Sequence, residues 1–183
     1  SSDPEQEYFS DGLTEEILNQ LAQVKGLLVT GRTSSFSFKG KNEDLRVIGE
    51  KLGVANLLEG SVRKDADQLR VTAQLIDGRT GGHLWSKTWD RQLEDVFAVQ
   101  QEIAQEIADS LEVQFAGGGG PRSVGTDSVE AYEHYLQGRH LWRQRGEGPL
   151  RASIEQFEAA IELDPGFARA HSGLAAATAV LVS

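Results

Sequence analysis

The segment from Ser153 to Pro165 constrains the fold more than any other part of the chain. Small and aromatic residues recur through it at helical spacing, among them Phe157 and Ala160. Pro165 lacks an amide hydrogen and disfavours helical geometry in the residue before it, so a helix must end at Asp164. Ala160 lets a second helix come close, while Phe157 fills the space between the two. The segment therefore predicts one helix of a closely packed helical pair.

Composition narrows the classes of function. The chain has 183 residues, 39% hydrophobic and 25% charged, which is typical of one or two small globular domains. Its formal net charge of -10 argues against a nucleic-acid surface, which needs clustered Lys and Arg. No apolar run approaches the length of a membrane span, so we expect no direct membrane insertion. Without cysteine there is no disulfide or thiolate zinc site, and without methionine we expect a fragment of a longer protein.

A run of four glycines, Gly117 to Gly120, marks a boundary. Consecutive glycines lose too much backbone entropy to lie inside a helix or strand. A phosphate-binding loop is the alternative, but no Lys-Ser or Lys-Thr follows the glycines, and Pro121 interrupts any helix start. The sequence therefore predicts an α/β domain, a linker and a helical region, over residues 1–114, 115–125 and 126–183.

The first region has the pattern of helices packed on a mixed sheet, of the α/β or α+β class. Its first helix is expected to open near Asp11 and to stop at Gly26. Alternating polar and apolar residues with turn-rich connectors predict an antiparallel three-strand meander. In chain order we expect a helix, a buried strand, a helix, three strands and a helix, over residues 13–24, 27–30, 45–52, 56–64, 68–77, 83–90 and 96–111.

The second region is predicted to be helical throughout. Asp127 and Glu130 have the spacing of a capping box at the start of its first helix. That helix carries aromatic and small residues at helical spacing, namely Ala131, Tyr135, Gly138 and Trp142. A third helix begins near Phe167, and we expect it to expose apolar surface.

The sequence contains no pattern that arranges side chains for catalysis. The four histidines lack the spacing of metal ligands, and no Gly-x-Ser-x-Gly motif presents a serine nucleophile. Glu15 and Glu16 are expected in the first turn of a helix, as solvated caps rather than an acid/base pair. Glu102, Glu106 and Asp109 are expected on the solvent-exposed face of a later helix. We therefore expect no catalytic residue, no metal and no cofactor.

One loop offers polar groups to a ligand. It follows the predicted strand 27–30, and an anion or small polar ligand could bind its side chains, Arg32, Thr33, Ser34 and Ser35. The structural alternative, which we favour, is that the hydroxyls satisfy backbone groups while Arg32 pairs with a carboxylate. For Trp85 and Trp89, which share a strand face, we favour a buried core role over an exposed recognition surface.

Six motifs are spread along residues 3–114. They are the runs YFSDGLTEE, TGRTSSF, LEGSVR, HLWS, WDR and FAVQQEI, which begin at residues 8, 30, 58, 83, 89 and 97. Together they resemble the TolB-like amino-terminal domain, related to the flagellar FlgO-type domain. The resemblance implies a bacterial protein whose other parts are an adenylate or guanylate cyclase, a winged-helix regulator or a protein kinase. It also implies tetratricopeptide repeats after the domain, and residues 153–165 resemble the second helix of such a repeat.

The sequence departs from this family in two ways. The family usually has an apolar strand before the segment that starts at Ser1, and its absence would leave a sheet edge open to another chain. The chain also carries only about one and a half repeats, whereas three or more are normally needed for stability. We expect Tyr135, Trp142 and Leu174 to contact a protein partner. We also expect homodimers to form through the unfinished repeat or the vacant strand position.

These features favour a non-catalytic regulatory or scaffolding fragment of a bacterial multidomain signalling protein. Its expected role is protein–protein interaction or ligand sensing. Two alternatives stay open: a regulatory portion that acts directly on the activity of a nucleotide cyclase, and a periplasmic envelope component. The compartment is likewise open between the bacterial cytoplasm and the periplasmic portion of a membrane-anchored protein.

Overall fold

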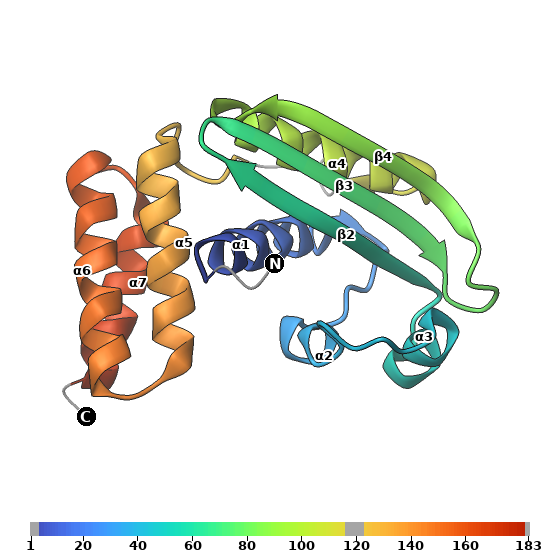
Figure 1. Cartoon of the computed structure of the whole chain (residues 1–183), viewed down its shortest axis with the longest axis horizontal. Coiled ribbons are helices and arrows are strands. Elements are labelled where there is room, and N and C mark those ends of the chain that lie inside the picture. Colours follow the sequence, from blue (N-terminus) through green and yellow to red (C-terminus); the bar gives the residue numbers. More distant parts are fainter. Residues whose placement is uncertain (1–3, 116–122, 182–183) are drawn as a thin grey trace. The chain divides into compact units, whose positions relative to one another are not determined.

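The computed structural model of the protein describes residues 4–115 and 123–181. They form two compact units, each described by itself below (Figure 1). We call Thr14–Arg122 the α/β unit, and Ser1–Leu13 together with Ser123–Ser183 the helical unit. The boundary between the units falls inside helix α1 (Pro4–Leu21), between Leu13 and Thr14. Residues 116–122 of the predicted linker, which include its four consecutive glycines, lie outside the described residues.

A three-stranded antiparallel sheet is the centre of the α/β unit. Its strands pair in the order β2-β3-β4 and cover Asn56–Asp65, Gln68–Asp77 and His83–Gln92. The pairing places Gly60 opposite Ala73 and Ala73 opposite Lys87. The predicted meander is thereby confirmed. A separate pair joins two short strands, β1 (Val24–Lys25) and β5 (Gln114–Phe115), also antiparallel. All strand pairs of the described residues are antiparallel, whereas the sequence predicted a mixed sheet.

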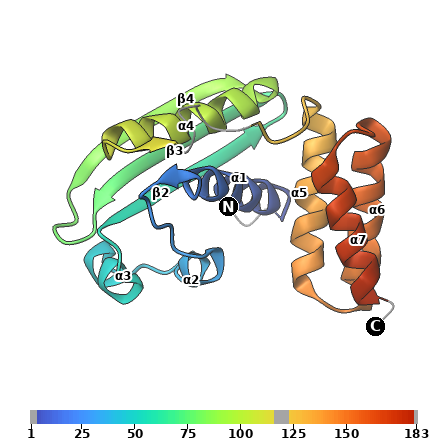
Figure 2. The ribbon, with the colours of Figure 1, turned by 180° about the vertical axis from the view of Figure 1, so that it is seen from behind.

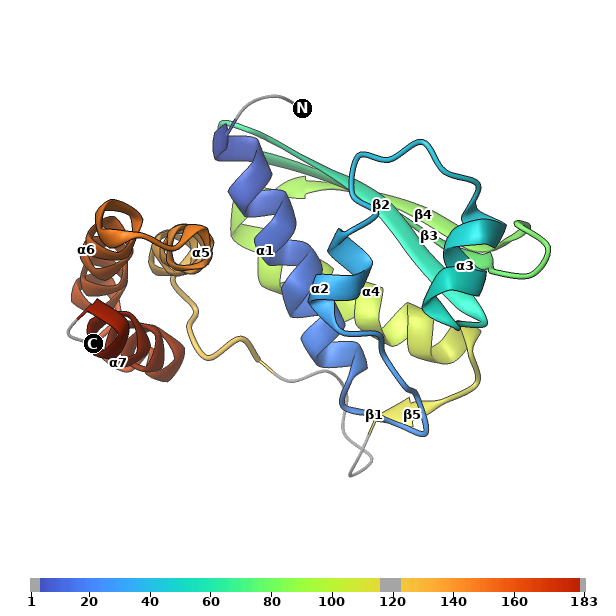
Figure 3. The ribbon, with the colours of Figure 1, turned by 90° about the horizontal axis from the view of Figure 1, so that it is seen from below.

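The two faces of the sheet differ in character. On one face, β3 presents a row of buried apolar residues, which comprises Leu69, Val71, Ala73 and Leu75. Helix α4 (Val96–Ser110) lies behind the sheet in Figure 1 and in front of it in Figure 2, so it covers this face. Figure 3 shows the second half of α1 on the same side of the sheet as α4. The burial of Ile17, Val99 and Ile103 on these helices shows that the core of the unit lies here.

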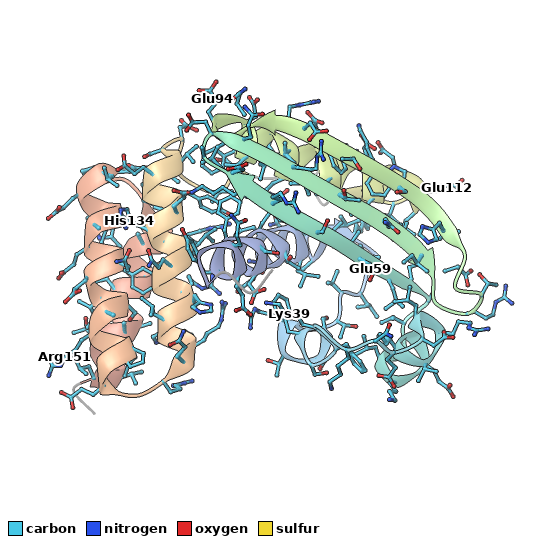
Figure 4. The ribbon with its side chains drawn as sticks, in the orientation of Figure 1. Lys39, Glu59, Glu94, Glu112, His134 and Arg151 are labelled. Atoms are coloured by element: carbon cyan, nitrogen blue, oxygen red, sulfur yellow. The ribbon has the colours of Figure 1, made fainter. Side chains whose placement is uncertain are left out.

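The opposite face of the sheet carries polar side chains that pair across the strands. The Arg70 guanidinium donates to the Asp90 carboxylate at 2.5 and 3.2 Å. The Thr72 and Thr88 hydroxyls lie 3.1 Å apart, and the Gln68 amide donates to Gln92 at 2.9 Å. Figure 4 shows the side chains along this face, with Glu59 of β2 labelled. We call these three cross-strand pairs the polar ladder.

Two expected elements of the α/β unit were placed wrongly. Residues 27–30 form no strand: Gly26 turns the chain with φ 81° directly after β1, and no strand among the described residues pairs with them. Leu28 is 96% exposed there. Helix α1 begins at Pro4 and ends at Leu21, where residues 13–24 were expected. A proline at the first helical position costs no hydrogen bond, since that amide has no partner within a helix.

Two short helices follow β1 in the α/β unit. Helix α2 (Arg32–Phe36) forms a single short segment, and α3 (Leu45–Leu52) lies just before β2. The Asp44 carboxylate caps α3 by accepting the Arg46 amide at 2.9 Å. Gly53 ends α3 in the left-handed conformation with φ 66°, so the helix covers the residues 45–52 that the sequence predicted.

Three helices make up most of the helical unit: α5 (Val129–Gln144), α6 (Glu147–Leu163) and α7 (Ala168–Leu181). Helix α6 ends immediately before Asp164 and Pro165, which confirms that prediction. The cap of α5 is Ser128, whose Oγ accepts the Ala131 amide at 3.1 Å, so the predicted capping box on Asp127 was wrong by one residue. Across the described residues, no helix combines the length and apolar character that crossing a bilayer requires.

Candidate functional site

The loop predicted to bind a ligand lies in the α/β unit, where most of it forms helix α2. Arg32 Nε lies 3.3 Å from Glu15 Oε2 of α1, and the two side chains are 27% and 11% exposed. The Arg32 guanidinium also lies 3.9 Å from the centre of the Phe36 ring, within the range of a cation–π contact. Arg32 is therefore positioned by an acidic and an aromatic neighbour.

The hydroxyls of this loop bond to the backbone of the same segment. The Ser35 hydroxyl donates to the Gly31 carbonyl at 3.3 Å, and the Ser37 hydroxyl donates to the Ser34 carbonyl at 2.7 Å. The amides of Ser34 and Ser35 also donate to Gly31. The structural alternative favoured for this loop was that its hydroxyls bond to backbone groups while Arg32 pairs with a carboxylate. These bonds and the Arg32 ion pair are the contacts that it predicted. Ligand binding at Arg32, Thr33, Ser34 and Ser35 stays a prediction.

Glu15 and Glu16 are buried in the middle of α1, so the expected solvated cap was wrong. Glu16 is 1% exposed, and Asn19 Nδ2 donates to its Oε1 at 3.4 Å. The error follows from the late start assigned to the helix. Phe9, Leu13, Glu16 and Gln20 lie at spacings of four, three and four, so they share one helical face. That spacing, extended from Phe9 rather than from Leu13, was the signal that Glu16 faces inward.

Helix α4 uses two carboxylates to hold strand β4. Trp89 Nε1 donates to Glu102 Oε2 at 2.8 Å, and Trp85 Nε1 donates to Glu106 Oε2 at 3.1 Å. Lys87 forms an ion pair with the same Glu106. The solvent-exposed role expected for Glu102 and Glu106 was therefore wrong. Of that predicted set, Asp109 is exposed and accepts a hydrogen bond from Gln105 of its own helix.

The two tryptophans belong to the packing of the α/β unit. Trp89 is 1% exposed, Trp85 is half-buried, and their ring centres lie 5.8 Å apart. The buried core role favoured for them is confirmed for Trp89, whereas Trp85 keeps part of its surface exposed. With both indole nitrogens bonded to carboxylates of α4, these rings fix the helix on the sheet.

The residues predicted to contact a partner lie at different depths in the helical unit. Tyr135 of α5 is buried, and its hydroxyl accepts a hydrogen bond from Arg139 at 2.8 Å. Its ring centre lies 5.0 Å from that of Phe167 and 6.2 Å from that of Phe157. Two further residues of this set, Trp142 at the end of α5 and Leu174 on α7, are half-buried.

Phe157 of α6 is the centre of packing in the helical unit. A Cβ atom built on Gly138 of α5 would lie 2.8 Å from the Phe157 ring, and one built on Gly173 of α7 would lie 2.6 Å from it. Real Cβ atoms essentially never come so close, so only glycine fits at both positions. The ring is 1% exposed, and Ala160 one turn later is fully buried. Phe157 therefore fills the space among three helices.

The carboxyl groups with shifted pKa values lie in caps, turns and the polar ladder. The side chain and amide of Arg46 hydrogen-bond to Asp44 and lower the pKa of that carboxyl to about 2. Bonds from Thr80 lower the pKa of Asp77, and a bond from Arg70 lowers that of Asp90. These shifts mark structural hydrogen bonds. Within residues 4–115 and 123–181, no group of three or more His, Asp or Glu side chains is arranged to hold a metal ion.

Comparison with known proteins matches the chain to one part of a longer protein. No family model matches it. It is 44% identical over 176 residues to a protein of Rhizobium meliloti (strain 1021) named "Putative adenylate cyclase 3". The match covers 95% of this chain but only 30% of that protein. The chain is thus similar to one part of a larger bacterial protein with a cyclase name.

Proposed function

We propose that this chain is a non-catalytic regulatory and scaffolding segment of a bacterial nucleotide cyclase. The observation that carries the proposal is the unequal coverage of the match, 95% of this chain against 30% of the Rhizobium protein. Both units fall within one matched segment, which leaves most of the relative for other domains. We also propose that the α/β unit is a TolB-like domain, a resemblance carried by its sequence motifs.

The use of the acidic side chains supports a non-catalytic role. Glu15 pairs with Arg32, while Glu102 and Glu106 accept hydrogen bonds from the tryptophans of β4. A general acid or base needs a carboxyl group within reach of a substrate proton. These three carboxyl groups are instead used to hold secondary-structure elements together.

We propose that α5–α7 are tetratricopeptide-like and recruit a protein partner. The support is steric, because Gly138 and Gly173 admit the Phe157 ring between three helices, as a helical repeat requires of small residues beside a large one. Trp142 and Leu174 are half-buried and keep part of their surface for contact. Tryptophan, as at position 142, is enriched at the energetic centres of protein interfaces.

The name of the relative favours a direct effect on cyclase activity over a passive tether. A regulatory segment acts by binding one state of its effector better than another. The proposal is therefore that ligand or partner binding to this segment shifts the equilibrium between active and inactive forms of an attached cyclase.

A domain exchange in the Rhizobium protein tests this proposal. The matched segment is replaced by this chain, and production of cyclic AMP from ATP is measured. We expect the exchanged protein to keep its activity, deletion of the segment to change that activity, and this chain alone to convert no ATP. Conversion by the isolated chain, or a deletion without effect on rate or regulation, would refute the proposal.

Two matched variants of the exchanged protein test the role of the helical unit by itself. Phe157→Ala removes the ring at the centre of the helical unit, so the exchanged protein with this change should behave like the deletion. Glu158→Ala alters the neighbouring exposed residue and should behave like the unaltered exchange. Equal behaviour of the two variants would count against a role for the helical unit.

A further inference from the structure

We propose that Arg63 and Arg70 bind a phosphate group on the face of the sheet that carries the polar ladder. The two arginines are direct partners in the pairing of β2 with β3. Both belong to the face opposite the buried apolar row of β3, and Figure 4 shows the side chains along it. Two positive charges are thus placed together within the α/β unit of a chain whose formal net charge is -10.

The strand pairing brings the two guanidinium groups within reach of one ligand. Directly opposite residues of an antiparallel pair have Cβ atoms about 5 Å apart, and their side chains leave the same face of the sheet. An arginine side chain is longer than this separation, so both groups can meet at one anion. Like charges directly opposite one another destabilise a sheet. The arrangement therefore has an electrostatic cost that a bound anion would remove.

The described residues neutralise one arginine of this pair and leave the other unpaired. Arg70 donates from Nε and one terminal nitrogen to the Asp90 carboxylate, at 2.5 and 3.2 Å. These bonds raise the pKa of Arg70 and lower that of Asp90, so both groups stay charged at neutral pH. Arg63 is exposed, and no carboxylate within residues 4–115 and 123–181 forms an ion pair with it. One positive charge of the pair is therefore left for a ligand.

A row of hydroxyl groups lies beside the arginines on the same face. Ser61 precedes Arg63 by two residues, the spacing of neighbours on one face of a strand, and it lies opposite Thr72. The hydroxyl of Thr72 lies 3.1 Å from that of Thr88, within hydrogen-bond distance. Ser61 is exposed, and its hydroxyl makes no hydrogen bond within the part of the chain that the structure describes. Ser61 is therefore a further donor for an anion held by Arg63.

The number of donors favours a phosphate over a carboxylate. Asp90 occupies Nε and one terminal nitrogen of Arg70, which leaves the other terminal nitrogen to a ligand, together with the whole guanidinium of Arg63 and the hydroxyl of Ser61. A carboxylate offers two oxygens to these donors, and a phosphate at least three. Planar guanidinium groups also bind phosphate oxygens in pairs. A phosphate group is therefore the ligand that uses the donors of this face most fully.

An NMR titration of the whole chain with inorganic phosphate tests the site, with sodium chloride used to hold the ionic strength constant. The side-chain Nε resonances of Arg63 and Arg70 are expected to shift together and to saturate. Arg63→Gln should weaken binding by about tenfold or more, because hydrogen bonds to charged groups are the stronger class. Arg63→Lys keeps the charge but loses the planar group, so its affinity should lie between those of the parent and Arg63→Gln.

Arg79→Gln is the matched control for the titration. Arg79 is an exposed arginine in the turn between β3 and β4, where no arginine lies opposite it. The variant loses the same charge as Arg63→Gln and should keep the affinity of the parent.

Thermal unfolding supplies a readout that a merely structural arginine would not change in the same way. Without phosphate, Arg63→Gln should be at least as stable as the parent, because it removes one of two opposite like charges. With phosphate, the parent should gain stability and the variant should not, because a ligand that binds only the folded state stabilises it. A loss of stability in Arg63→Gln without phosphate would assign Arg63 a structural role and contradict the proposal.

The titration can overturn the site in three further ways. Shifts that grow linearly without saturation would show general screening of charge. Shifts at Arg32 in place of Arg63 would move the anion to the loop of residues 31–35, and equal affinity for acetate would remove the preference for phosphate. The site goes beyond the proposed function, and since the titration uses this chain without a cyclase, its outcome is separate from that of the domain exchange.

Discussion

Helix α4 is joined to its sheet by directional hydrogen bonds, whereas α5, α6 and α7 are joined by the approach of two glycines to one aromatic ring. In the first case an indole nitrogen must meet a carboxylate oxygen, as Trp89 meets Glu102 at 2.8 Å. In the second case a Cβ at Gly173 would lie 2.6 Å from the Phe157 ring, so the fit depends on shape alone.

The difference predicts how each unit responds to substitution. A close-packed contact fails when volume is added or removed, because neighbouring atoms relax only partly. A hydrogen bond fails when its donor is lost, and the net cost is smaller because water competes for the same groups. The helical unit should therefore be the more sensitive to single changes at its centre.

Phe157→Ala should give the largest effect. Removal of a fully buried aromatic ring from the meeting point of three helices is expected to lower the free energy of unfolding by about 3–5 kcal/mol. Chemical denaturation followed by circular dichroism measures this change. Glu158→Ala is the control and should leave the unfolding midpoint near that of the parent. Equal stability of the two variants would show that the ring is not central.

Gly173→Ala should cause the second largest loss of stability. One added methyl group overlaps the Phe157 ring, and overpacking of this kind typically costs about 1–3 kcal/mol. Gly148→Ala adds the same group where nothing lies within 4 Å and should not destabilise the protein. A second change, Phe157→Leu, makes room for the methyl group. The double variant should therefore lose less than the sum of the two single losses, and strict additivity would contradict the contact.

Trp89→Phe should destabilise the protein less than Phe157→Ala or Gly173→Ala. It keeps most of the ring volume but removes the donor to Glu102, for which we expect a loss of about 1.5 kcal/mol. Trp85→Phe serves as the comparison, because Trp85 is half-buried and Lys87 still pairs with Glu106 after the change. If Trp85→Phe is the more harmful of the two, the hydrogen bond at Trp89 does not hold α4 as described.

The smallest effect should appear at the cap of α3 and should depend on pH. The pKa of the Asp44 carboxyl is lowered from 3.8 to about 2, so the folded state prefers the charged form. Its stabilising contribution is therefore complete above about pH 4 and is lost as the pH falls through about 2. Carboxyl resonances followed by NMR measure this pKa directly. Arg46→Ala should raise it toward 3.8, and an unchanged value would exclude Arg46 as the cause.

Local patterns predicted the strands and helices whose partners lie nearby in the sequence. The alternation of Leu69, Val71, Ala73 and Leu75 with polar residues located β3, and the turns on either side located its neighbours. Pro165 likewise located the end of α6. These features depend on the residues themselves, so the sequence contains the information needed to place them.

Features that depend on distant partners were predicted wrongly. Glu102 and Glu106 lie 13 to 21 residues from the tryptophans that bond to them, and nothing next to either glutamate indicates such a partner. The apolar run at residues 27–30 has the composition of a strand, but a strand also needs a neighbour with free backbone groups. For the loop, the sequence named the Arg32 ion pair as an alternative without identifying Glu15 as its acid.

The packing of three helices around the Phe157 ring has a consequence for proteolysis. Cleavage of the chain in the turn between α6 and α7 would cut the peptide but leave the contact of Gly173 with the ring. The released α7 piece should therefore elute from a sizing column together with the rest of the chain. Only denaturant, or a bulky side chain at position 173, should then separate the two pieces.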